Sequence, residues 1–213
     1  AGTAVNNNAA AVFLMLRALA AGKEVLVSRG ELVEIGGSFR IPDILREAGV
    51  TLVEVGTTNR TRLSDYEQAI TENTAALLKV HPSNYEMRGF TAEVTLPELA
   101  NLAHQHNLTA LYDWGSGSFY RFAQGPLLGH PTATQVLDSG VDVITFSGDK
   151  LLGGVQAGLI LGRETLVQQL RKHPLYRALR LDKGALALLE ETLAAYRDPT
   201  HVPERNPSVR MLE

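Results

Sequence analysis

Short apolar segments alternate with helix-like segments along most of this 213-residue chain. The apolar segments are rich in Val, Leu and Ile and are bounded by Gly, Asn or Asp, a pattern typical of buried strands. We expect strands at residues 25–28, 51–55, 76–80, 109–112, 141–144 and 157–161. We expect helices at residues 9–22, 96–106, 132–139, 164–172 and 184–196, among others. This alternation predicts an α/β fold with a mostly parallel, doubly wound sheet that is flanked by helices.

Polar clusters lie at the ends of several of these expected strands. They comprise residues 6–8, 28–31, 81–84, 113–118 and 147–150. Parallel sheets bind their ligands at the carboxyl ends of the strands. The convergence of these clusters therefore predicts one ligand site at that edge of the sheet.

Lys150 follows the expected strand at residues 141–144 and precedes the glycine pair Gly153-Gly154. A surface lysine needs neither a buried strand nor glycines beside it. Partial desolvation lowers the pKa of an amine and makes it a better nucleophile. Glycines allow the backbone to approach a flat ligand closely. We therefore predict that Lys150 is partly desolvated and forms a Schiff base with pyridoxal 5'-phosphate (PLP).

Asp113 ends the expected strand at residues 109–112 and precedes a Gly- and Ser-rich loop. By itself it is more simply explained as a loop-capping residue. A carboxylate beside the pyridine nitrogen of PLP keeps that nitrogen protonated and makes the ring an electron sink. Because Lys150 lies one β–α unit further along the chain, we predict this cofactor role for Asp113.

The start of the first expected helix is a candidate phosphate site. Asn7, Asn8 and Ala9 lie where the helix begins, so an asparagine caps it and the remaining N–H groups face outward. Free N–H groups and the helix dipole attract anions. A simple capped helix is the alternative, and the presence of Lys150 favours the cofactor phosphate.

Further polar residues are candidates for smaller roles around the cofactor. Ser147 precedes Lys150 by three residues and is a candidate donor to the phosphate, or a serine bonded to its own backbone. Ser116 is a candidate partner of the ring hydroxyl, with a plain turn serine nearly as probable. Asn84, and less firmly His81, are candidates for the ring or its hydroxyl oxygen.

Two arginines and an aspartate complete the candidate set. Arg177 and Arg180 are three residues apart, a spacing that places two guanidinium groups on one face of a helix or a turn. Such a pair suits an oxyanion substrate, although a solvated cationic face is equally consistent. Asp149 directly precedes Lys150 and either assists proton transfer or caps the local backbone.

The composition narrows the classes of function. The chain has no cysteine, which excludes a disulfide, a thiolate zinc site and a cysteine nucleophile. A formal net charge of −3 argues against broad, non-specific binding of nucleic acid. His104 and His106 point in different directions on an expected helix, so we expect no metal site. No apolar run approaches the length of a membrane span, and we expect a cytoplasmic protein.

Several segments together resemble one enzyme family. The segment 147–158 is similar to the PLP-lysine segment of bacterial selenocysteine synthase, L-seryl-tRNA(Sec) selenium transferase. The other similar segments are 5–11, 28–37, 55–60, 113–118 and 177–183. The resemblance runs from Ala1 to about Pro199. One departure is Val155, which stands where the family often has proline.

The resemblance implies the large domain of a fold type I PLP-dependent transferase. It implies conversion of seryl-tRNA(Sec) to selenocysteinyl-tRNA(Sec), with selenophosphate as the selenium donor. In that reaction Lys150 is the Schiff-base lysine and removes the Cα proton, hydroxide leaves, and selenium adds to Cβ. Arg177 and Arg180 are implied to hold selenophosphate.

The resemblance also implies how the chain is organised. Residues 1–199 are expected to be the PLP-binding large domain, and residues 200–213 a linker toward a C-terminal small domain. We expect that small domain and the family's N-terminal tRNA-binding region to be absent here, so that the chain is a fragment. The family assembles as rings of dimers, which implies a homo-oligomer.

Two other functions stay open at this point. One is a PLP-dependent lyase that acts on a free amino acid; a persulfide-carrying desulfurase is excluded because it needs a cysteine. Some PLP desulfurases carry histidine where this chain has Asp149. The other is a non-catalytic scaffold or tRNA-binding fragment.

Overall fold

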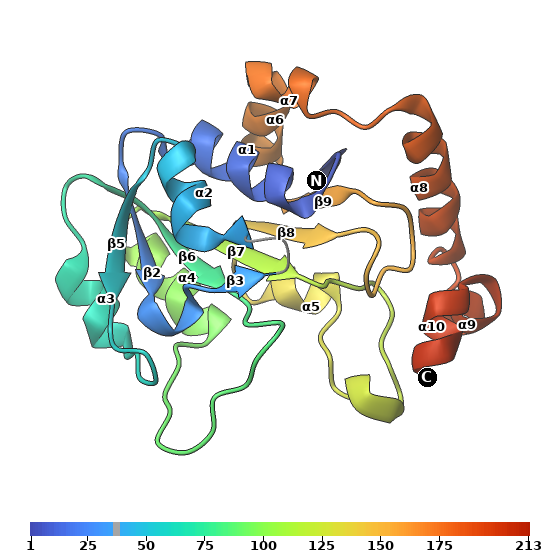
Figure 1. The fold of residues 1–213 in the computed structure, drawn as a ribbon, viewed down its shortest axis with the longest axis horizontal. Helices are drawn as coiled ribbons and strands as arrows, with labels where there is room; N and C mark the ends of the chain where they lie inside the picture. The colour runs from blue at the N-terminus through green and yellow to red at the C-terminus, as the bar shows by residue number, and fades with distance from the viewer. Residues whose placement is uncertain (36–38) are drawn as a thin grey trace.

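The computed structural model describes residues 1–35 and 39–213 of the chain. Its centre is a seven-stranded sheet in the order β1-β9-β8-β7-β6-β2-β5 (Figure 1). The strands are β1 (Gly2–Val5), β2 (Glu24–Ser28), β5 (Thr51–Val55), β6 (Thr74–Val80), β7 (Thr109–Gly115), β8 (Val143–Ser147) and β9 (Gly158–Gly162). A separate two-stranded sheet pairs β3 (Glu34–Ile35) with β4 (Phe39–Arg40). Part of the similar segment 28–37, at Gly36 and Gly37, lies outside the described residues.

The sheet is mostly parallel, as predicted. The strands β5, β2, β6, β7 and β8 run parallel to their neighbours. β9 is antiparallel to β8, and β1 is antiparallel to β9. The carboxyl end of β1 therefore lies at the same edge of the sheet as the carboxyl ends of β7 and β8.

Helices cover both faces of the sheet (Figure 1). They are α1 (Asn8–Ala20), α2 (Ile41–Glu47), α3 (Leu63–Ala69), α4 (Leu96–Gln105), α5 (Ala133–Asp138), α6 (Glu164–Lys172), α7 (Pro174–Ala178) and α8 (Lys183–Ala195). The helices α1, α2 and α6 contribute to one buried apolar cluster, and α3, α4, α5 and α8 to the other. Burial of apolar surface on both faces of the sheet stabilises this arrangement.

The C-terminal segment 200–213, which we expected to be a linker, is helical and contains two prolines. It forms α9 (Val202–Arg205) and α10 (Pro207–Leu212). Both prolines lie in the first turn of a helix, where a missing N–H costs no hydrogen bond. Val202 and Val209 are buried against Phe122, so this segment is packed onto the core.

No helix among the described residues is long and apolar enough to cross a membrane.

Candidate functional site

Asp113 is buried near the carboxyl end of β7 and is the centre of the site. Asn8 Nδ2 donates a hydrogen bond to Asp113 Oδ1 at 2.9 Å, and Thr145 Oγ1 donates to the same oxygen at 3.3 Å. Burial raises the pKa of this carboxyl group, and the two donors and the charge of Lys150 oppose that rise. The positive charge of Lys150, the predicted Schiff-base lysine, is thus one of the influences that lower the pKa of Asp113.

The N-terminus of α1 lies beside this carboxylate. Asn7 caps the helix, and its Oδ1 accepts from Ala10 N at 2.8 Å. In the part of the chain that the structure describes, the backbone N–H groups of Asn8 and Ala9 have no hydrogen-bond partner. The helix therefore presents free N–H groups at the sheet edge, as the phosphate interpretation requires. The Asn8 side chain turns toward Asp113, a contact that was not predicted from the sequence.

Ser147 and Lys150 follow β8 at the same edge. Ser147 is buried at the last position of the strand, and Lys150 lies in the turn that follows. The turn is closed by a hydrogen bond from Gly153 N to Lys150 O at 2.8 Å. Lys150 is exposed, so the predicted partial desolvation is wrong for the chain by itself. The same turn is covered further along, at the buried Leu152, whose O accepts from the Tyr196 hydroxyl at 2.7 Å and from Asn206 Nδ2 at 2.9 Å. Asp149 is exposed too, and among the described residues it has no hydrogen bond or ion pair to Lys150.

The loop after β7 places Ser116 close to a histidine that the sequence did not single out. His130 Nε2 lies 3.2 Å from Ser116 O, and its ring stacks on Trp114 with centroids 5.4 Å apart. Burial lowers the pKa of His130. Ser116 is half-buried near Asp113, which is compatible with its predicted role. His130 carries no sequence signal, since it follows a loop without periodicity.

His81 and Asn84 lie after β6 and have different surroundings. The His81 backbone N–H donates to Asp113 O at 2.9 Å, and burial is the main cause that lowers the pKa of its half-buried ring. Asn84 is exposed, and its Nδ2 donates to Glu34 O at 2.9 Å. The structure thus brings His81 to Asp113 and does not bring Asn84 there.

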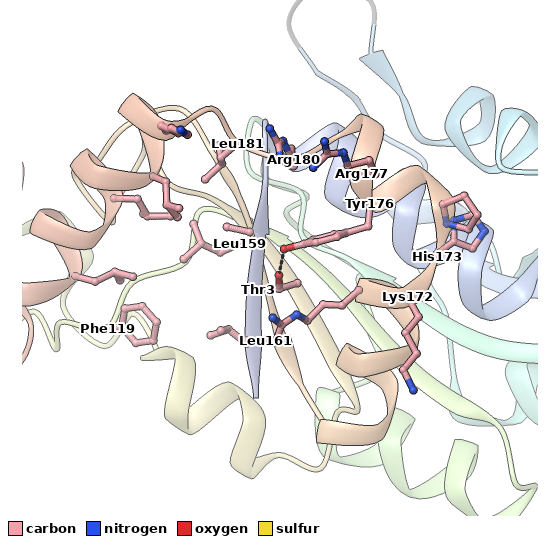
Figure 2. A pocket seen from close by; sticks show the side chains of 18 residues that line it. Thr3, Phe119, Leu159, Leu161, Lys172, His173, Tyr176, Arg177, Arg180 and Leu181 are labelled. Atoms are coloured by element: carbon pink, nitrogen blue, oxygen red, sulfur yellow. Dashed lines mark hydrogen bonds between the residues drawn. The ribbon is translucent and has the colours of Figure 1, made fainter.

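Arg177 and Arg180 line a groove of about 840 Å³ at the β1–β9 side of the sheet. Figure 2 shows both guanidinium groups near each other above Tyr176, whose hydroxyl bonds Thr3. Both arginines are exposed, and neither Asp113 nor Lys150 lines this groove. The link to the site is a backbone hydrogen bond from Asn6 N to Leu179 O at 2.9 Å.

A buried ion pair on the opposite face of the sheet was also missed. Lys79 Nζ lies 2.9 Å from Glu31 Oε1, and Val80 N donates to Glu31 Oε2 at 2.9 Å. Burial is the largest influence on Glu31 and raises its pKa, while Lys79 opposes the rise. Side chains alternate along β6, so Lys79 faces away from the side on which Asp113 lies.

The residues at the sheet edge fit PLP. A buried carboxylate, free helix N–H groups and an accessible lysine lie at the carboxyl ends of β7, β1 and β8. These groups match the ring nitrogen, phosphate and aldehyde of the cofactor. A buried acceptor without a partner among the described residues, Asn8 Oδ1, lies in the same cluster.

Comparison with known proteins gives one consistent family. The family model described as "L-seryl-tRNA selenium transferase" matches residues 1–213. The chain is 57% identical over 208 residues to L-seryl-tRNA(Sec) selenium transferase of Yersinia enterocolitica, covering 98% of this chain and 45% of that relative. It is 56% identical over 212 residues to the protein of that name from Geobacter sulfurreducens, covering 100% of this chain and 46% of the relative. The chain therefore spans about half the length of these curated relatives.

Solved structures give the fold class. D-Glucosaminate-6-phosphate ammonia-lyase matches with a TM-score of 0.73 and 23% identity, over 92% of this chain and 53% of that chain. Aspartate aminotransferase of Thermus thermophilus matches with a TM-score of 0.68 and 19% identity, over 99% and 52%. Both have the fold of type I PLP enzymes, which confirms the predicted fold class. Since the family model matches the sequence from its first residue to its last, this chain belongs to the L-seryl-tRNA selenium transferase family.

Proposed function

We propose that this chain is the PLP-binding core of an enzyme that converts seryl-tRNA(Sec) to selenocysteinyl-tRNA(Sec) with selenophosphate. The observation that carries the proposal is the buried Asp113, which accepts hydrogen bonds from Asn8 and Thr145 at the carboxyl edge of the sheet, the edge at which Lys150 follows β8. Residues 1–199 are proposed to be the cofactor-binding large domain. The family membership selects this reaction from the many that the fold supports.

Asp113 and Lys150 have the central roles. When bound, PLP supplies an electron-withdrawing ring that stabilises negative charge at the substrate Cα. Asp113 provides a carboxylate for the ring nitrogen and favours its protonated form. Lys150 would hold the cofactor through its amine and, once the seryl amine has taken its place, would accept the Cα proton. The Cβ hydroxide would leave as water, selenium from selenophosphate would add to Cβ as Cα regains a proton, and water would cleave the Se–P bond and release phosphate.

The exposure of Lys150 does not oppose these roles. The amine must be accessible to reach the cofactor aldehyde. Removal of water around an amine favours its uncharged form. In the chain by itself Asp149 and Lys150 are exposed. We propose that bound cofactor and a neighbouring subunit cover Lys150. Asp149, exposed beside Lys150, is proposed to assist proton transfer, and Asp149→Asn tests that role.

Anionic groups have two proposed seats. We propose that the cofactor phosphate binds to the free N–H groups of Asn8 and Ala9, next to the Asn7 cap. The Ser147 hydroxyl is proposed as a further donor to the phosphate. Ser116 and Asn84 are proposed partners of the ring hydroxyl, although Asn84 would have to leave Glu34 O.

The second seat is for the selenium donor. Arg177 and Arg180, in the groove beside α7, are proposed to bind the oxyanion of selenophosphate. We also propose a homo-oligomer, supported by Leu186 and Leu188 of α8, which are 55% and 60% exposed. Gel filtration tests that part directly.

A covalent label tests the function. The purified chain is mixed with PLP, its visible spectrum is recorded, and the mixture is reduced with borohydride and digested. We expect a new absorbance band and a pyridoxyl group on the peptide that contains Lys150, both lost in Lys150→Ala. Lys183→Ala, which removes an exposed lysine on α8, serves as the matched control and should keep both signals. A label that spreads over other lysines, or no band at all, would reject the proposal.

A further inference from the structure

Two side chains from distant parts of the sequence bind the same oxygen of Asp113. Asn8 is the first residue of α1, and Thr145 is the cross-strand neighbour of Asp113 on β8. Their hydrogen bonds, at 2.9 Å and 3.3 Å, both end on Oδ1. Among the described residues no side-chain donor reaches Oδ2. The two side-chain donors thus hold the carboxylate by Oδ1 and leave Oδ2 free of side-chain donors in the described chain, while the backbone N–H of Gly115 is a further donor to the carboxylate.

The chemistry of the contact fixes which form of Asp113 it favours. The Asn8 amide donates through Nδ2, and an ionised carboxylate can only accept. Burial acts in the other direction and raises the pKa of Asp113. The other influences that lower this pKa are the charge of Lys150 and a backbone hydrogen bond from Gly115. Removal of the Asn8 or Thr145 donor should therefore raise the pKa further.

Packing or helix capping alone does not explain why residue 8 is an asparagine, because its Oδ1 atom has no partner in the described part of the chain. Asn8 Oδ1 is buried and has no hydrogen-bond partner in the chain as far as it is described. An unmet buried acceptor is unfavourable, so packing alone would favour an apolar side chain here. The helix does not need Asn8 as its cap, because Asn7 already has that role. The contact with Asp113 is the feature that explains an amide at position 8.

We propose that Asn8 and Thr145 are positioning residues, which hold Asp113 by Oδ1 and leave Oδ2 for the ring nitrogen of the cofactor. This inference rests on the proposed function, since it assigns Asp113 to that nitrogen. It gives Asn8 a second role beside the phosphate contact of its backbone N–H. Asn8 would thus contact the phosphate through its backbone N–H and Asp113 through its side chain. One residue would therefore set the position of the phosphate site relative to the partner of the ring nitrogen.

The test measures Asp113 itself, first without any cofactor. The carboxyl carbon of Asp113 is followed by 13C NMR as a function of pH in the cofactor-free chain, and is assigned by its absence from Asp113→Asn. Asn8→Ala and Thr145→Val should each raise the pKa of Asp113, whereas Thr145→Ser should restore it because the hydroxyl is kept. Thr3→Val is the matched control, since it removes a strand hydroxyl that bonds Tyr176 and not Asp113.

The second measurement is PLP affinity, read from the absorbance of the bound cofactor. We expect the dissociation constant to rise roughly tenfold in Asn8→Ala and in Thr145→Val, and to change little in Thr3→Val. An unchanged Asp113 titration in two variants with native circular dichroism would overturn the proposal. So would a raised Asp113 pKa with unchanged PLP affinity. Absence of PLP binding by the wild-type chain would instead reject the proposed function, and the Asp113 titration would still decide whether the two donors hold the carboxylate.

Discussion

Gly158 packs directly against the carbonyl group of Asn7, and a Cβ atom at position 158 would lie 2.0 Å from Asn7 O. Gly158 is the first residue of β9 and pairs with both Val5 and Ser147. It therefore lies between the strand that leads into α1 and the strand that leads to Lys150. This close approach places the α1 N-terminus at the carboxyl edge of the sheet.

Gly158→Ala should accordingly destabilise the chain and disturb the phosphate seat. Because the added methyl group would meet backbone atoms, which cannot rotate away, we expect a loss of at least about 2 kcal/mol in the free energy of unfolding. Urea denaturation followed by circular dichroism measures it. Gly184→Ala in α8 is the control, because the nearest atom there is the movable Asp182 side chain at 3.1 Å. The control should be neutral or gain up to about 1 kcal/mol; equal losses in both variants would contradict this account.

The local pattern of the sequence was sufficient for the fold class. Alternating apolar and helical segments predicted the parallel sheet, and the polar residues at the carboxyl ends of two expected strands predicted Asp113 and Lys150 at one edge. The pairing of Asn8 with Asp113 was not predictable, since the two residues are 105 positions apart and no local pattern encodes such a contact. For the same reason the Lys79–Glu31 pair was missed.

Exposure was the least predictable property. The apolar strand before Lys150 suggested that its amine is partly desolvated, yet Lys150 lies in the turn beyond the strand and is exposed, whereas Leu152 of the same turn is buried. Burial of each turn residue depends on what packs over it, and a strand pattern describes only the strand. The helices of segment 200–213 were not predicted either, because proline starts a helix as readily as it interrupts one.

Asp113→Asn should stabilise the cofactor-free chain at neutral and alkaline pH. Burial raises the pKa of Asp113, so its contribution to stability is present below the ordinary value of 3.8 and is lost as the pH rises through the folded-state pKa. The wild type should thus fall progressively below Asp113→Asn in melting temperature as the pH rises above the ordinary value of 3.8. A difference of about 1 kcal/mol corresponds to roughly 2–4 °C for a chain of this size. If the difference in melting temperature stayed constant or reversed with pH, the hydrogen bonds around Asp113 would be sufficient to stabilise its ionised form without cofactor.

Lys79→Met should be strongly destabilising, and a second substitution should recover part of the loss. Loss of Lys79 leaves the Glu31 carboxylate buried without its cation, and such changes reduce stability by about 3–5 kcal/mol. The loss should grow with pH as Glu31 ionises. Lys79→Met combined with Glu31→Gln should be less destabilised than Lys79→Met alone. Denaturant titration at several pH values measures all three chains.

The control for that pair is an exposed one. Arg88 and Glu86 form an ion pair whose side chains are 83% and 68% exposed. Arg88→Met should change stability by less than about 1 kcal/mol, because solvent screens exposed pairs. If Lys79→Met and Arg88→Met had similar effects, the Lys79–Glu31 pair would have no special role in holding the turn after β2 against β6.

Arg180→Ala should weaken the binding of selenophosphate to the PLP-loaded chain about tenfold, because a guanidinium group contributes charge-assisted hydrogen bonds to an oxyanion. Arg177→Ala should have an effect of the same order. Arg171 lines the same groove from α6 and is exposed as well, so Arg171→Ala removes an equal charge at a different place. Isothermal titration calorimetry at two salt concentrations distinguishes a defined oxyanion site from a diffuse cationic surface. A diffuse cationic surface would respond alike to all three substitutions and would lose its affinity at high salt, whereas a defined oxyanion seat would distinguish Arg177 and Arg180 from Arg171.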